Sequence, residues 1–167
     1  MATISRPPTA SLSSLKIICA ALCIGPSIFM ILAFILGADD GGDLTAIAAT
    51  VNIQRYVMLA MCVGVTIAAK IMGDRILYGV SSMRRGEGNF EARYVSSSIV
   101  RMALLEGVTL FSCVVLIQMP QALKQSDPLT YLHLIPLFLL FLQVIAVFPT
   151  DPKVTQARER FDSQNNG

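Results

Sequence analysis

The stretch SSIVRMALLEGVTLFSCVVLIQM, residues 97–119, is the most informative part of this sequence about its fold. A helix that crosses a bilayer needs roughly 20 predominantly apolar residues, and this run has that length and character. It also contains two ionisable residues, Arg101 and Glu106, and Glu106 stands about 14 Å along the expected helix at a rise of 1.5 Å per residue. Because an ionisable group inside a membrane helix is costly, both residues need partners or a function.

Three further stretches, residues 15–37, 56–76 and 129–148, are equally apolar and long enough to span a bilayer. The segments between them are short and rich in polar residues, Gly, Pro or Ser. The sequence therefore predicts an all-α fold in which four antiparallel transmembrane helices form one membrane helical bundle. No segment between the spans is long enough for a second domain.

The composition agrees with a membrane protein. The 167 residues are 54% hydrophobic and only 14% charged, the mean hydropathy is +0.63, and a soluble domain carries about 25% charged residues. The net charge of +2 gives no basic surface of the kind that binds nucleic acid.

The ends of the chain differ from the spans. We expect residues 1–14 to form a disordered arm, residues 15–149 to form the transmembrane domain, and residues 150–167 to form a cytoplasmic tail. Asp151 followed by Pro152 is typical of a helix start. A short amphipathic helix is therefore predicted from about Pro152 to Phe161, followed by a disordered end.

The direction of the spans follows from the lysines and arginines in the short loops, which favour the cytoplasmic side. One side of the expected bundle has nine of them: Arg6, Lys16, Arg75, Arg84, Arg85, Arg93, Lys153, Arg158 and Arg160. The other side, made of loops 38–55 and 120–128, has Arg55 and Lys124. Both termini are therefore expected in the cytoplasm of a bacterial cell with the four spans in the inner membrane. The arginines of the 74–96 loop set this topology, and attraction of anionic headgroups is a further reading of them.

Four charged residues of the second and third spans can meet. Descending the second span gives Lys70 and then Asp74, and ascending the third gives Arg101 and then Glu106. In antiparallel neighbours Lys70 has the depth of Glu106, and Asp74 has the depth of Arg101. We expect the ion pairs Lys70–Glu106 and Asp74–Arg101, which fix the register of the two helices and offset the cost of burial. A proton- or ion-carrying role for Glu106 and a ligand site are the alternatives.

Other polar or reactive residues give weaker indications. Cys19 and Cys23 lie on one helix face, and Cys62 and Cys113 could in principle complete a metal site, but small hydrophobic packing is the preferred interpretation. His133, the one histidine, is expected to pack at the membrane interface. Because no catalytic constellation, cofactor motif or metal motif is recognisable, we expect neither an enzyme nor a cofactor or metal site.

Three segments, LKIICAALCIG (15–25), RMALLEGVTLF (101–111) and FPTDPKV (148–154), resemble a family of small, uncharacterised four-helix proteins of the bacterial inner membrane. This resemblance implies a multi-pass membrane protein and no known activity. The segment around Glu106 is also similar, more loosely, to the carboxylate-bearing helix of the rotary ATPase proteolipid subunit. That resemblance implies that Glu106 binds a translocated ion.

These observations lead to one expectation and one alternative. The chain is expected to be a structural or accessory membrane protein that contacts membrane lipids. A second copy of the chain and another membrane protein are alternative protein partners. The alternative is an ion- or proton-translocating subunit that uses Glu106.

Overall fold

The computed structural model describes residues 10–37, 44–78 and 90–165, and within these ranges the regular structure is helical. The elements are α1 (Ala10–Ile35), α2 (Leu44–Tyr78), α3 (Phe90–Gln118), α4 (Gln121–Ser126), the 3-10 helix η1 (Pro128–Leu134), α5 (Ile135–Val147) and α6 (Asp151–Asn165). Four segments are long and apolar enough to cross a membrane: Leu12–Ile35, Thr45–Tyr78, Phe90–Gln118 and Pro128–Val147.

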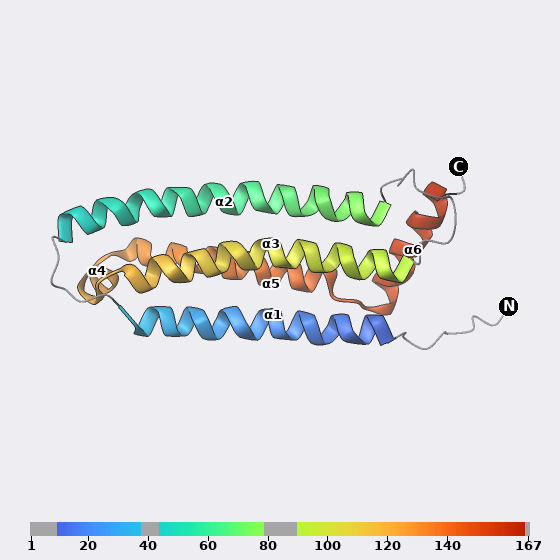
Figure 1. Cartoon of the computed structure of the whole chain (residues 1–167), viewed down its shortest axis with the longest axis horizontal. Helices are drawn as coiled ribbons and strands as arrows, with labels where there is room; N and C mark the ends of the chain where they lie inside the picture. Colours follow the sequence, from blue (N-terminus) through green and yellow to red (C-terminus); the bar gives the residue numbers. More distant parts are fainter. Residues whose placement is uncertain (1–9, 38–43, 79–89, 166–167) are drawn as a thin grey trace.

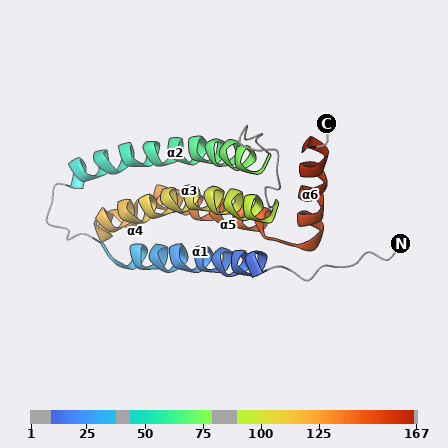
Figure 2. The ribbon, with the colours of Figure 1, turned by 45° about the vertical axis from the view of Figure 1, so that its right-hand side comes forward.

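Helices α1, α2, α3 and α5 lie side by side, and α4 and α6 mark the two ends of the molecule (Figure 1). At one end, here called the α4 end, α1 and α3 finish, α2 begins and α4 lies. At the other, here called the α6 end, α1 and α3 begin, α2 and α5 finish, and α6 runs across the bundle rather than along it (Figure 2).

Helix α3 is the centre of the bundle, and it packs against α1, α2 and α5. In its most apolar window 44% of the residues are buried inside the molecule, whereas the fraction is 22% in α1 and in α2. The outer helices therefore expose much of their apolar surface. On α1 this surface is a stripe at helical spacing made of Ile17, Ile24, Ile28, Ile31 and Ile35.

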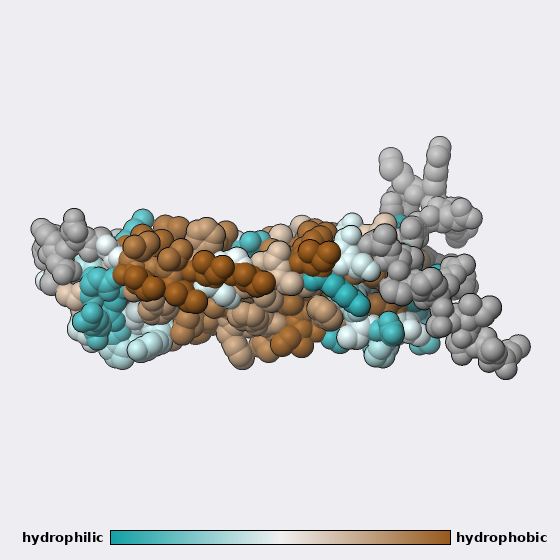
Figure 3. All heavy atoms as spheres, turned by 90° about the horizontal axis from the view of Figure 1, so that it is seen from below, coloured by the Kyte–Doolittle hydropathy of each residue, from teal (hydrophilic) through white to brown (hydrophobic). Residues whose placement is uncertain are grey.

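Figure 3 shows the resulting distribution of hydropathy, with hydrophobic side chains over the middle of the molecule and hydrophilic side chains at both ends. Contiguous exposed apolar surface of this extent is rare on soluble monomers. The surface suits contact with lipid.

Several helix ends differ from the sequence-based expectation. Helix α2 begins at Leu44, so that residues 44–55, expected in an outer loop, are helical. The physical reason is packing, because Val51 belongs to a buried cluster with Met30 of α1 and Leu116 of α3. With 35 residues, α2 is about 52 Å long at 1.5 Å per residue and exceeds the roughly 30 Å hydrocarbon core of a bilayer.

Three other helices also extend beyond their predicted ends. Helix α1 begins at Ala10, inside the expected arm of residues 1–14, since Leu12 already packs against the core. Helix α3 begins at Phe90 rather than at residue 97, and α6 continues beyond Phe161 to Asn165. Residues 1–9, and with them most of the expected disordered arm, lie outside the described residues, as do Arg84 and Arg85.

The fourth span is not one continuous α-helix. It starts as the 3-10 helix η1, and Pro136 stands in the first turn of α5. Proline lacks an N–H donor and is tolerated in the first turn of a helix, where that donor would have no partner within the helix. Pro136 therefore starts α5 instead of kinking the middle of a helix.

The α4 end of the bundle is closed by side chains that bind the last carbonyl groups of α1. Lys124 Nζ donates hydrogen bonds to the carbonyls of Ala33, at 2.6 Å, and Leu36, and Gln121 Nε2 donates to Ile35 O at 2.6 Å. The last carbonyls of a helix have no partner within it, and a cation there is also favoured by the helix dipole. These contacts fix α4 on the end of α1.

Candidate functional site

The predicted pair of Asp74 and Arg101 is present. Arg101 Nη2 of α3 lies 2.5 Å from Asp74 Oδ1 of α2, and the exposed fractions of the two side chains are 19% and 46%. One turn away, Ser97 Oγ donates a 2.8 Å hydrogen bond to the carbonyl of Gly73. Two polar contacts therefore join α2 and α3 near the α6 end.

Gly73 makes this contact sterically feasible. A Cβ atom at this position would lie 2.7 Å from both Cγ and Cδ of Arg101, and closer still to its Nε. The Arg101 side chain thus lies directly against the backbone of α2 where no side chain stands. Only a glycine leaves this space.

The predicted pair of Lys70 and Glu106 is wrong: within the described part of the chain these two residues form no ion pair, and Lys70 is exposed. The reason is the five-residue spacing of Arg101 and Glu106, which separates them by about 140° around the helix. Since Arg101 faces α2, Glu106 cannot do so.

Glu106 lies on the α1 side of α3 instead. Met102 and Cys113, four residues before it and seven after it, share its helix face. Met102 lies against α1, where its Sδ is 3.6 Å from Cys19 Sγ, and Cys113 belongs to a buried cluster with Met30 and Ala33 of α1. Glu106 itself is half-buried.

A cavity of about 680 Å³, here called the α6-end cavity, brings three of the four predicted site residues together. Lys70, Asp74 and Arg101 line it, and Glu106 does not. Residues of α5 and α6 complete the lining, including Val147, Lys153, Gln156 and Arg160. Further toward the middle of the bundle, side chains of α2 and α5 close the space, because Met58 and Cys62 form a cluster with Val108 to which Ile135 and Leu139 add.

Helix α6 is held over this cavity by aromatic contacts. Phe161 packs edge-on against Phe90 of α3, with ring centroids 5.5 Å apart. Arg158 lies 6.0 Å from the centre of the Phe90 ring, and Arg93 lies 5.7 Å from that of Phe161. A guanidinium at such a distance is attracted by the face of the ring. Lys153 Nζ in addition donates to Ile145 O at 2.5 Å, which caps the end of α5.

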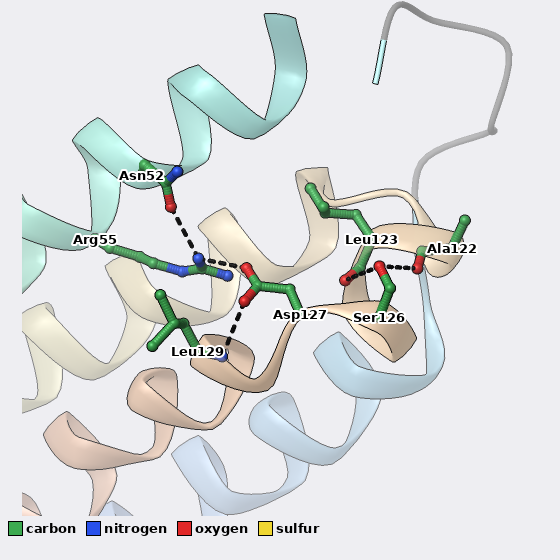
Figure 4. Close-up of polar contacts among 7 residues, drawn as sticks. All are labelled: Asn52, Arg55, Ala122, Leu123, Ser126, Asp127 and Leu129. Atoms are coloured by element: carbon green, nitrogen blue, oxygen red, sulfur yellow. Dashed lines mark hydrogen bonds and ion pairs between the residues drawn. The ribbon is translucent and has the colours of Figure 1, made fainter. Parts of the chain in front are cut away.

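A second polar cluster, near the α4 end, was not found by sequence reasoning. Arg55 of α2, expected in an outer loop, is 3% exposed, and its Nη1 lies 2.5 Å from Asp127 Oδ2 and 3.0 Å from Asn52 Oδ1 (Figure 4). The other oxygen of Asp127 accepts the N–H of Leu129 at 3.0 Å and so caps η1. The Asp-Pro pair at 127–128, a typical helix start, and the Ala-rich run before Arg55 could have indicated both helices.

The charge of Asp127 is stabilised by these contacts. Burial by itself acts to raise the pKa of this carboxyl group, but the hydrogen bonds from Leu129 N–H and Arg55, together with the charge of Arg55, outweigh burial and lower the pKa. Asp127 and Arg55 therefore form a charged pair at neutral pH.

His133 of η1 is completely buried inside the bundle, close to the α4 end. Ser112 Oγ of α3 lies 3.0 Å from His133 Nδ1 and donates a 2.9 Å hydrogen bond to His133 O. A hydroxyl has one proton to donate, so Nδ1 carries the ring hydrogen and donates it to Ser112 when both bonds form. This pair joins α3 to η1.

The cysteines do not gather into a metal site in the described residues. Cys19, Cys62 and Cys113 belong to three separate buried clusters, in which each packs as a small apolar side chain. The residues that the structure describes contain no group of three or more His, Cys, Asp or Glu that could hold a metal ion.

Comparison with known proteins adds no relative to this description. No protein-family model, curated protein or solved structure matches the chain.

Proposed function

We propose that the chain is a multi-pass protein of the bacterial inner membrane whose four spans alternate in direction, with the α6 end in the cytoplasm. Four segments with the length and apolar character of membrane spans support the proposal. The excess of lysine and arginine in the segments at the α6 end supports the orientation, since these residues are retained on the cytoplasmic side.

Within that membrane we infer a structural or accessory role without enzymatic chemistry. This inference rests on the buried polar side chains, which bind polar groups of neighbouring helices. Arg55 pairs with Asp127, Ser112 with His133, and Lys124 with the end of α1. Such contacts specify one arrangement of the helices, and they leave the exposed apolar faces of α1 and α2 for lipid or a protein partner.

Photo-crosslinking in cells tests this role. A photoreactive amino acid is placed at Ile28 of α1 or Ile67 of α2, which are 52% and 55% exposed. An accessory component of an assembly gives a discrete protein adduct from at least one face, formed with another protein or with a second copy. Adducts with lipid alone from both positions would contradict an accessory role.

Ion or proton translocation is a second candidate, favoured by the position of Glu106. This residue stands in the middle of the α3 span, half-buried, on the seam with α1. A carboxyl group that takes up and releases protons in lipid should react with a hydrophobic carbodiimide.

The substitution Glu106→Gln separates the two functions. Because Glu106 has no ion pair with Lys70, we expect this change to alter the unfolding free energy by less than about 0.5 kcal/mol. For a translocating subunit the same change abolishes both carbodiimide labelling and ion flux in proteoliposomes. If the chain is instead an accessory protein, the unmodified chain shows neither carbodiimide labelling nor ion flux.

A further inference from the structure

The α6-end cavity has a composition that fits a negatively charged guest. Among the described residues that line it, four side chains are cationic, Lys70 of α2, Arg101 of α3, and Lys153 and Arg160 of α6, and one is a carboxylate, that of Asp74. Asp74 engages one nitrogen of Arg101, while the buried Nε of Arg101 makes no hydrogen bond within the described part of the chain. Positive charge therefore exceeds negative charge inside one cavity.

The cations come from three helices, α2, α3 and α6, and α6 reaches the bundle only at this end (Figure 1). Lys70 of α2 and Arg160 of α6 both line the cavity, and both side chains are exposed. The aromatic contacts of Phe161 with Phe90 keep α6, and with it Arg160, on this side of the bundle. Ser97, Ser98 and Tyr78 also line the cavity, and their side chains are small or polar.

The position of the cavity indicates what kind of anion it meets. It lies where the apolar segments of α2, α3 and α5 end, which is the depth of lipid headgroups if these segments cross a bilayer. Exposed apolar side chains of α2 and α5 stand on the bundle surface next to it, among them Ile71, Met72 and Ile145. Basic pockets between membrane helices on the cytoplasmic side bind phosphate-bearing headgroups, and acyl chains can lie on the adjoining apolar surface.

We propose that the α6-end cavity binds the phosphate-bearing headgroup of an anionic phospholipid. Arg101, held by Asp74 against Gly73, supplies a fixed cationic wall. Lys70 and Arg160 supply two mobile charges that close on the phosphate, and the acyl chains lie along α2 and α5. The site is separate from the Arg55–Asp127 pair, which lies at the other end of the bundle, and from Glu106.

The full chain in nanodiscs or mild detergent provides the test. Thermal unfolding and lipid-bound native mass spectra are compared for phosphatidylglycerol, for zwitterionic phosphatidylcholine and for inorganic phosphate. We expect phosphatidylglycerol to bind and to raise the melting temperature, with a weaker effect of phosphatidylcholine. Equal effects of the two lipids would overturn the proposal. Equal protection by millimolar inorganic phosphate without lipid would overturn the lipid assignment and indicate a soluble phosphate compound instead.

A double variant, Lys70→Gln with Arg160→Gln, tests the named residues. Each basic residue near an anionic headgroup contributes about 1 kcal/mol, so we expect about thirtyfold weaker binding of phosphatidylglycerol. Both side chains are exposed, and fold stability without lipid should be unchanged. The matched control is Lys16→Gln combined with Arg75→Gln, which also removes two positive charges, because both residues are exposed near the same end and neither lines the cavity. Equal loss of binding in the control and the double variant would show attraction by overall charge and would refute a site.

Discussion

Arg55 is almost completely buried, and Asp127 is the carboxylate that balances its charge. Removing one partner of a buried pair leaves the other charge uncompensated and typically costs about 3–5 kcal/mol. Because asparagine keeps a hydrogen-bond acceptor, we expect Asp127→Asn to lower the unfolding free energy by about 2–4 kcal/mol. Chemical unfolding in mild detergent, followed by circular dichroism, measures the loss.

The control for this substitution is Glu159→Gln, which removes an exposed carboxylate of α6. A surface change of this kind stays within about 0.5 kcal/mol. Equal stability of both variants and the unmodified chain would mean that the Arg55–Asp127 pair does not hold α2 to η1.

The same pair makes stability depend on pH in a defined window. The contacts of Asp127 outweigh its burial and lower its pKa, so the folded state binds this proton less readily than the unfolded state. The contribution of Asp127 is therefore complete above its ordinary value of 3.8, and it is lost as the pH falls through the lower folded value. We expect the stability difference between the unmodified chain and Asp127→Asn to be constant from about pH 7 to 5 and to shrink below about pH 4. If this stability difference shrinks between pH 7 and 5 instead, a group other than Asp127 causes the pH dependence.

The sequence allowed one of the two ion pairs in the second and third spans to be predicted. Asp74 and Arg101 share a depth in neighbouring helices, and depth follows from counting residues. The pairing also depends on which side chain of α3 faces α2. The sequence spacing showed that Arg101 and Glu106 cannot both face α2, but it did not show which of them does. The Arg55–Asp127 pair was missed because both residues were assigned to loops, where charges need no partner.

At the scale of the helices, Gly73 allows α2 and α3 to approach. In Gly73→Ala the new methyl group would collide with Arg101, and the displaced side chain would weaken its pair with Asp74. Overpacking of this kind typically costs about 1–3 kcal/mol. We expect the unfolding free energy of Gly73→Ala, measured in mild detergent, to fall by that amount.

Gly64→Ala on the same helix is the matched control. A Cβ atom at Gly64 meets nothing within 4 Å, and alanine is the better helix former by about 1 kcal/mol. Stability should therefore stay constant or rise in this variant. If both substitutions change stability in the same direction and by the same amount, helix propensity rather than the Arg101 contact is the cause.

The existence and order of the long helices could be predicted, since each is an apolar run of membrane-spanning length. Their ends could not be predicted as well. The predicted spans left out residues 44–55 of α2 and 90–96 of α3 because both segments contain polar and charged residues, yet Val51 and Tyr94 bury apolar surface against neighbouring helices. Tertiary packing extends these helices, and a window of hydropathy does not detect packing.

For the molecule as a unit, the face drawn in Figure 3 is apolar over the middle and polar at the two ends, which fits a protein that crosses a bilayer. The alternation of four apolar runs with polar segments along the sequence predicted this division. The α6-end cavity was not predictable, because its walls come from residues between Lys70 and Arg160, far apart in the sequence. Only the arrangement of α6 across the end of the bundle brings them together.

We propose above that the four spans cross the membrane with the α6 end in the cytoplasm. Cysteine labelling in intact cells tests it most directly, in a chain whose four native cysteines are replaced by alanine. Ser126→Cys marks the α4 end and Ser163→Cys marks α6, and both positions are exposed. A membrane-impermeant maleimide should label Ser126→Cys in intact cells and Ser163→Cys only after the cells are opened. Labelling of Ser163→Cys in intact cells would contradict the account.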